Sequence, residues 1–153
     1  MRFEGDRLRA YPDPGSGGDP WTIGYGHTAS VYPGEEITPD QAIVFLKTDV
    51  ANAEAIVSRD VEVQLNSNQF SALVSFVFNT GTLGCGVLAA VNSERFLDVR
   101  RELAKWRFAS GQALPGLASR RAVEATLFEK PWKSAFRPLP PGPIGKDGVK
   151  TSL

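Results

Sequence analysis

The pattern of apolar residues changes at Thr38, and this change limits the folds open to the chain. Between residues 21 and 32, β-branched and aromatic residues interrupted by glycines predict the short strands of a small sheet. Thr38 is a suitable N-cap, and the proline after it suits the first position of a helix. Apolar residues then recur at helical spacing, which predicts a helix over about 39–58.

Three further helices are predicted after this one. The segment 66–81 begins with Asn66 or Ser67 as its cap and ends at Gly81. It is apolar nearly all round, so it is expected to be the buried central helix. Amphipathic helices are predicted over 92–106, capped at Asn92 or Ser93, and over 117–130.

A small N-terminal sheet followed by a helical body is an α+β arrangement. A cleft between the two parts is the natural place for a ligand. A chain of 153 residues is expected to form one domain, assigned here to 1–136, because the proline-rich and glycine-rich segment 137–153 suits a tail.

Charge and hydropathy exclude several classes of protein. Seventeen basic and 17 acidic residues give a formal net charge of zero, so no nucleic-acid partner is expected. The sequence contains no run of 18 apolar residues and no hydrophobic signal core, so a soluble protein without a membrane span is expected. Basic residues gather in two patches of the second half, interpreted as solvated helix faces or as attraction to a polyanionic surface such as a bacterial wall: Arg100, Arg101, Lys105, Arg107, Arg120 and Arg121.

One cysteine and one histidine are too few for a zinc site of ordinary ligands, and neither a metal nor a cofactor is predicted. Cys85 has no histidine or basic cluster beside it, so it is expected to be a small buried apolar side chain.

The opening stretch carries the candidate chemistry. Glu4 and Asp13 are carboxylates nine positions apart, the first expected on a short helix and the second on a turn that leads into the sheet. Two carboxylates in unequal environments are what cleavage of a glycosidic bond requires, one to donate a proton and one to support the attacking water. Thr22 could add a hydroxyl that orients this water. Residues of these types are also common as solvated or turn-forming side chains, so the pattern alone is a weak signal.

The same stretch resembles a known family. The residues EGDRLRAYPD, from Glu4 to Asp13, and WTIGYGHT, from Trp21 to Thr28, are similar to the phage-type lysozymes, the muramidase endolysins of glycoside hydrolase family 24. NQFSALVSFVFNTG resembles the central helix of that family, and GLASRRAVEATLF resembles its late helix that bears an arginine. The similarity covers about residues 3–131.

The resemblance implies a lysozyme-like fold and hydrolysis of the β-1,4 bond between N-acetylmuramic acid and N-acetylglucosamine in bacterial peptidoglycan, with inversion. It implies Glu4 as the general acid, Asp13 as the second carboxylate and Thr22 as the hydroxyl that positions water. His27 corresponds to a structural histidine and is given no proton-transfer role. The implied contacts to substrate come from Gly26, Phe78, Asn79 and Arg120, of which Arg120 corresponds to the arginine that reaches the catalytic glutamate. A monomer is expected, made in the cytoplasm of the host bacterium without a signal peptide and acting on the cell wall.

Two departures from the family pattern leave alternatives open. Eight residues separate Asp13 from Thr22 where the family has five, so Asp19 competes with Asp13 for the role of second carboxylate. Only three residues precede Glu4, where relatives have a full helix, so the chain is either a truncation or holds Glu4 by other contacts. The alternative functions are a catalytically impaired module, which binds the wall or is part of a virion, and a lytic transglycosylase.

Overall fold

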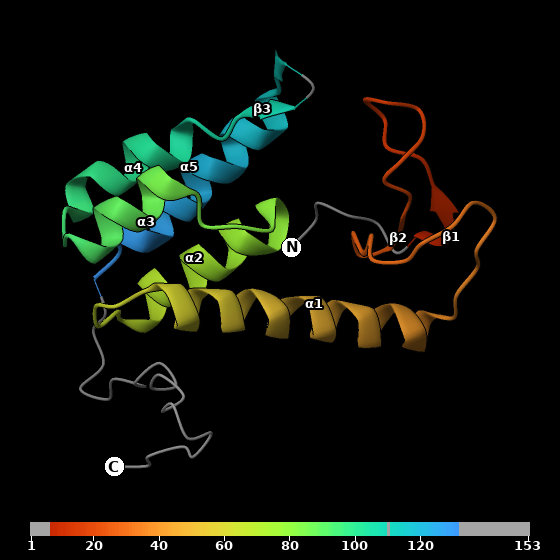
Figure 1. Cartoon of the computed structure of the whole chain (residues 1–153), viewed down its shortest axis with the longest axis horizontal. Coiled ribbons are helices and arrows are strands. Elements are labelled where there is room, and N and C mark those ends of the chain that lie inside the picture. The colour runs from red at the N-terminus through yellow and green to blue at the C-terminus, as the bar shows by residue number, and fades with distance from the viewer. Residues whose placement is uncertain (1–6, 110, 132–153) are drawn as a thin grey trace, which may run out of the picture. The chain divides into compact units, whose positions relative to one another are not determined.

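The structure is a computed structural model that describes residues 7–109 and 111–131. The chain divides into two compact units, Met1–Asn52 and Ala53–Leu153. The first holds the N-terminal pair of strands and the second most of the helices, so the predicted α+β layout is confirmed (Figure 1). Glu4 and the predicted tail lie outside the described residues.

The first unit is built on two antiparallel strands, β1 (Arg7–Tyr11) and β2 (Thr22–Gly24). The segment 35–37 lies along β1 as well: the Ala10 N–H donates to the Glu35 carbonyl, and the Ile37 N–H donates to the Leu8 carbonyl, both at 2.9 Å. The sequence predicts strands throughout 21–32 and none at 7–11. The structure corrects both points, because β1 becomes a strand by pairing with segments that are distant in sequence.

Helix α1 (Pro39–Asp60) begins where the sequence predicts. The Gln41 N–H donates to Thr38 Oγ1 at 3.2 Å, and the Thr38 N–H donates to Gln41 Oε1 at 2.8 Å. This reciprocal pair satisfies backbone donors that have no partner within the helix.

Helix α2 (Ser67–Thr80) confirms both predicted ends. Asn66 accepts from the Gln69 N–H at 2.8 Å, and Gln69 Oε1 accepts from the Asn66 N–H at 2.9 Å, which completes a capping box. At the other end Gly81 has φ +79°, a conformation that glycine adopts without the steric penalty of a side chain.

The helix predicted over 92–106 is the shorter α4 (Phe96–Ala104), and it is preceded by α3 (Cys85–Asn92), which was not predicted. Asn92 is not an N-cap: its Oδ1 accepts from the Glu62 N–H at 2.9 Å, and its Nδ2 donates to the Asp60 carbonyl at 3.1 Å. The chain breaks between the helices, where Glu94 has φ +54°. Cys85, expected to be buried, is exposed because it lies at the first position of α3.

After α4, a short hairpin of β3 (Phe108–Ala109) and β4 (Gln112–Ala113) leads into α5 (Pro115–Glu129). Helix α5 begins two residues before the predicted start, with Pro115 in its first turn. It packs against α2 and α4.

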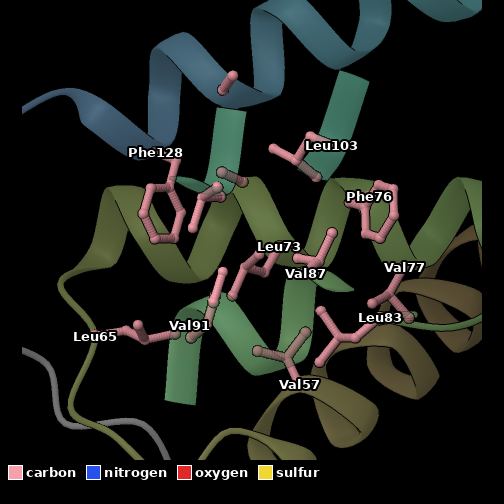
Figure 2. Packing of buried hydrophobic residues seen from close by; sticks show 14 of the residues in the cluster. Val57, Leu65, Leu73, Phe76, Val77, Leu83, Val87, Val91, Leu103 and Phe128 are labelled. Carbon is pink, nitrogen blue, oxygen red and sulfur yellow. The ribbon is translucent and has the colours of Figure 1, made fainter. Parts of the chain in front are cut away.

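The core of the second unit centres on α2, as predicted (Figure 2). Phe76 has no exposed surface, and its ring meets that of Trp106 edge to face with centroids 5.4 Å apart. Phe78 is only partly buried. The labelled core side chains come from all five helices and the connections between them: Val57, Leu65, Leu73, Phe76, Val77, Leu83, Val87, Val91, Leu103 and Phe128.

Among the described residues, no helix is both long enough and apolar enough to cross a membrane.

Candidate active site

Asp13 organises the glycine-rich turn of the first unit. Its Oδ2 accepts hydrogen bonds from the N–H groups of Gly15 at 3.0 Å and Ser16 at 2.9 Å. Its own N–H donates to the Gly18 carbonyl at 2.9 Å, and its carbonyl accepts from the Gly17 N–H at 2.8 Å. These four bonds fix the position of a half-buried carboxylate whose Oδ1 takes no part in the turn.

Asp19, the competing carboxylate, lies on the same turn but is exposed. Its backbone carbonyl accepts from Ser16 Oγ at 2.8 Å, whereas no hydrogen bond to the side-chain oxygens occurs among residues 7–109 and 111–131. The turn therefore holds Asp13 in one orientation and does not hold the Asp19 side chain. A fixed orientation is what a group acting on a bound substrate requires, and this favours Asp13.

Thr22 and Asp13 lie at the same end of the β1–β2 pair. Thr22 is directly opposite Tyr11, the last residue of β1, and Asp13 follows Tyr11 by two positions. Thr22 is half-buried, and within the described part of the chain its hydroxyl forms no hydrogen bond. Gly26, a predicted substrate contact, lies in the tight turn after β2 with φ +93°.

His27 is held between two side chains of α1. Its Nδ1 lies 2.8 Å from Asp49 Oδ2 and 3.0 Å from Oδ1, and its ring stacks on Phe45 with centroids 4.4 Å apart. The turn after β2 is thereby tied to the helix that follows. These contacts agree with the structural role that the resemblance implies for His27.

The second unit holds the remaining predicted residues. Phe78 and Asn79, both partly buried, lie in the last turn of α2. Asn79 Oδ1 accepts a hydrogen bond of 2.9 Å from Nη2 of Arg121 on α5. The structure thus brings Asn79 together with Arg121, the residue that follows the predicted Arg120.

Arg121 belongs to a buried network of charged and polar side chains. Its Nη2 donates to Glu124 Oε1 at 3.0 Å, and its Nε lies 2.7 Å from Oε2, with the N–H pointing off the line to that oxygen. Ser75 Oγ donates to Glu124 Oε1 at 2.9 Å, and the Arg121 guanidinium lies 4.9 Å from the centre of the Phe76 ring. Both charged side chains are only 2% exposed.

Burial dominates the ionisation of this pair. It raises the pKa of Glu124 above the ordinary value of 4.5, although Arg121 and Ser75 favour the ionised form. Burial likewise lowers the pKa of Arg121, against the attraction of Glu124. Each charge therefore depends on the other to remain in the interior.

Arg120, the predicted partner of the catalytic glutamate, is also close to Glu124. Its Nε lies 3.5 Å from Glu124 Oε1, and its side chain is 13% exposed. Glu4 lies outside the described residues, so the contact between Arg120 and Glu4 stays a prediction. Arg121 was interpreted as part of a solvated basic patch, and this interpretation is wrong, because Arg121 is only 2% exposed.

Sequence reasoning missed Arg121, Glu124, Ser75 and Asp49 as members of these clusters. A signal for two of them was present, because Arg121 and Glu124 are three positions apart on a predicted helix and can therefore pair. The partners on α2 and α1 depend on tertiary packing. Within the described ranges no three histidine, cysteine or acidic side chains gather in a way that could hold a metal ion.

Comparisons with known proteins give the family. The model of the phage lysozyme family matches residues 1–124. An endolysin of Acyrthosiphon pisum secondary endosymbiont phage 1 is 37% identical over 135 residues, covering 84% of this chain and 90% of that protein. An endolysin of Bacillus phage PZA is 38% identical over 131 residues, covering 82% of this chain but 50% of that longer protein.

Among solved structures, the muramidase domain of SpmX from Asticaccaulis excentricus superposes with a TM-score of 0.71 at 37% identity, covering 84% of this chain and 90% of that domain. The expected lysozyme-like α+β fold is confirmed, and so is the expected class, an endolysin-type muramidase and therefore a glycoside hydrolase. The chain belongs to the phage lysozyme family.

Proposed function

We propose that this chain hydrolyses the β-1,4 bond between N-acetylmuramic acid and N-acetylglucosamine of bacterial peptidoglycan, with Glu4 as the proton donor. The family match that begins at residue 1 and includes Glu4, Asp13 and Thr22 carries this proposal. Glu4 in its protonated form donates to the leaving oxygen, and the ionised Asp13 supports the water that attacks the sugar.

The geometry of the turn supports Asp13 as the second carboxylate. Backbone N–H groups of Gly15 and Ser16 hold one carboxylate oxygen, and the other is left for a water molecule. Thr22, opposite Tyr11 at the same end of the strand pair, supplies a hydroxyl that orients this water. An inverting outcome follows if a water molecule occupies the space between the two carboxyl groups, which requires a separation of roughly 6.5 Å or more.

Asparagine substitution separates the two candidate carboxylates. Asp13→Asn should lower the rate of wall hydrolysis by about 100-fold or more, since it removes the group that activates water. Asp19→Asn is the matched control on the same turn and should keep the parent's rate within about twofold, as expected for an exposed side chain without catalytic contacts. The reverse order of effects would transfer the role to Asp19.

Mass spectrometry of the released muropeptides tests the reaction itself. Hydrolysis yields reducing ends at N-acetylmuramic acid, whereas a lytic transglycosylase yields 1,6-anhydro ends. Predominantly anhydro products would overturn the hydrolytic proposal. We also propose that the chain acts on the wall as a monomer, since one chain supplies every residue in the proposed mechanism.

A further inference from the structure

The hydrogen bond between Asn79 and Arg121 fixes which atoms the Asn79 amide can offer to a ligand. A guanidinium has five N–H donors and no acceptor, so the amide can face it only with its oxygen. The 2.9 Å contact to Nη2 therefore defines the orientation of the Asn79 side chain. The amide nitrogen must then point away from Arg121.

The Asn79 amide nitrogen has two N–H donors available to a ligand. Among residues 7–109 and 111–131 no hydrogen bond is made by Nδ2, and the side chain is only partly buried. The amide therefore presents two N–H donors and no free acceptor beyond the last turn of α2. A group of this kind recognises a carbonyl oxygen and disfavours a cation or another donor.

Arg121 cannot easily release the amide oxygen. Its guanidinium is held by Glu124 at 2.7 and 3.0 Å and lies against the Phe76 ring, and it is 2% exposed. Glu124 is itself fixed by the hydroxyl of Ser75 at 2.9 Å. A buried donor deprived of its acceptor carries a desolvation penalty, so the network keeps Asn79 Oδ1 in place.

We propose that Arg121 is a positioning residue that locks Asn79 with its NH2 group outward, and that Asn79 thereby selects the carbonyl oxygen of an N-acetyl group on the glycan strand. This inference rests on the proposed muramidase function, because it is the peptidoglycan substrate that supplies acetamido carbonyls. A de-N-acetylated sugar carries an ammonium group at the same position. The ammonium group has only N–H donors, as the outward face of the Asn79 amide does, so the two cannot form a hydrogen bond.

The experiment compares two forms of one substrate, N-acetylated peptidoglycan and the same preparation after chemical de-N-acetylation. The ratio of kcat/KM on the two forms is measured from the release of reducing ends. The parent should prefer the acetylated form, and Asn79→Ala should reduce this preference by about three- to tenfold, the effect of one neutral hydrogen bond. Asn79→Asp should reduce it at least as much, because a carboxylate accepts hydrogen bonds from the ammonium group and donates none to the acetyl carbonyl. Asn68→Ala is the matched control, because Asn68 lies on the same helix and donates to the Lys130 carbonyl instead. It should keep the parent's ratio.

A preference that is unchanged in both Asn79 variants would overturn the inference while leaving the hydrolytic function intact. Absence of hydrolysis by the parent on either substrate would overturn the proposed function itself. The two failures are therefore distinguishable.

The positioning role of Arg121 has its own test. Arg121→Gln offers both a donor and an acceptor, so the Asn79 amide can turn over, and the preference should fall as in Asn79→Ala. Retention of the full preference by a folded Arg121→Gln protein would contradict the role. Since this variant also loses the buried ion pair with Glu124, ¹⁵N relaxation of the Asn79 side-chain NH2 group in the parent provides a second readout. An order parameter near that of rigid backbone, about 0.85, is expected, and a value below about 0.6 would contradict a locked amide.

Discussion

Arg121 and Glu124 form an ion pair within one turn of α5, with Nε and Oε2 2.7 Å apart and both side chains 2% exposed. A buried pair of this kind gives little net stability relative to apolar residues of similar size, but removal of one partner leaves the other charge without compensation. The pair also connects α5 to α2 through Ser75 and Asn79. Its disruption is therefore expected to affect both the stability and the orientation of a candidate site residue.

Truncation of Glu124 should be strongly destabilising. Glu124→Ala leaves the Arg121 guanidinium buried without its counter-ion, and the free energy of unfolding should fall by about 3–5 kcal/mol. Urea denaturation measures this loss. The matched control is Glu129→Ala, which breaks the exposed pair with Arg100 at 2.7 Å and should lower the stability by less than about 1 kcal/mol. Equal losses in the two variants would contradict the account of the buried pair.

The pH dependence of stability should report the raised pKa of Glu124. A carboxyl group whose pKa is raised on folding stabilises the protein fully below its unfolded value of 4.5, and this contribution is lost as the pH rises through the folded value. The stability of the parent relative to Glu124→Gln should therefore decrease as the pH rises above 4.5. Denaturation curves of both proteins across this range provide the measurement. A relative stability that increases with pH would mean that Arg121 lowers the pKa of Glu124 instead.

Phe76 should be among the most costly core positions to truncate. The side chain has no exposed surface and contacts both Trp106 and Arg121, so Phe76→Ala should lower the free energy of unfolding by about 3–5 kcal/mol. Leu97→Ala provides the comparison, because Leu97 is 96% exposed and its loss should change stability by less than about 0.5 kcal/mol. Thermal and chemical denaturation should rank the two variants in this order.

Two glycines with positive φ differ in what an added side chain would meet. Gly84 has φ +66° and Gly111 has φ +76°, but a Cβ at Gly84 would overlap the Trp106 ring, whereas a Cβ at Gly111 would meet open space. Gly111→Ala should lower the free energy of unfolding by about 1–2 kcal/mol from backbone strain alone. Gly84→Ala should lower it by a further 1–3 kcal/mol or so, because the indole must move. Similar losses in the two variants would indicate that Trp106 yields easily.

The elements that the sequence predicted correctly are those specified by local signals. Helix ends are marked by Thr38 before Pro39 and by Asn66 and Gly81. The signals are hydrogen bonds and backbone conformations that involve only a few neighbouring residues. Strand β1 could not be predicted in this way, because its partners are 22–24 and 35–37. The start of α4 was placed too early because Glu94, rather than a glycine, adopts the left-handed conformation that precedes the helix.

The part of the candidate site that lies within one short sequence motif was predictable. The part that depends on packing between distant segments was not. The turn that holds Asp13 follows from its glycines and proline. The burial of Arg121 does not follow from its type, since arginine is rarely buried unless it is paired, and the sequence shows two adjacent arginines without indicating which one faces the core. Arg121 is the arginine that faces the core, because it pairs with Glu124, which in turn accepts a hydrogen bond from Ser75 of α2.

The central claim is that Glu4 donates the proton that cleaves the glycosidic bond, and lysis of a peptidoglycan suspension tests it most directly. Glu4→Gln removes the transferable proton but little packing, so the free energy of unfolding should change by less than about 1 kcal/mol. The rate of clearing should fall by about 100-fold or more, while binding to the wall in a sedimentation assay is retained. A Glu4→Gln protein that clears the suspension at the rate of the parent would contradict the account.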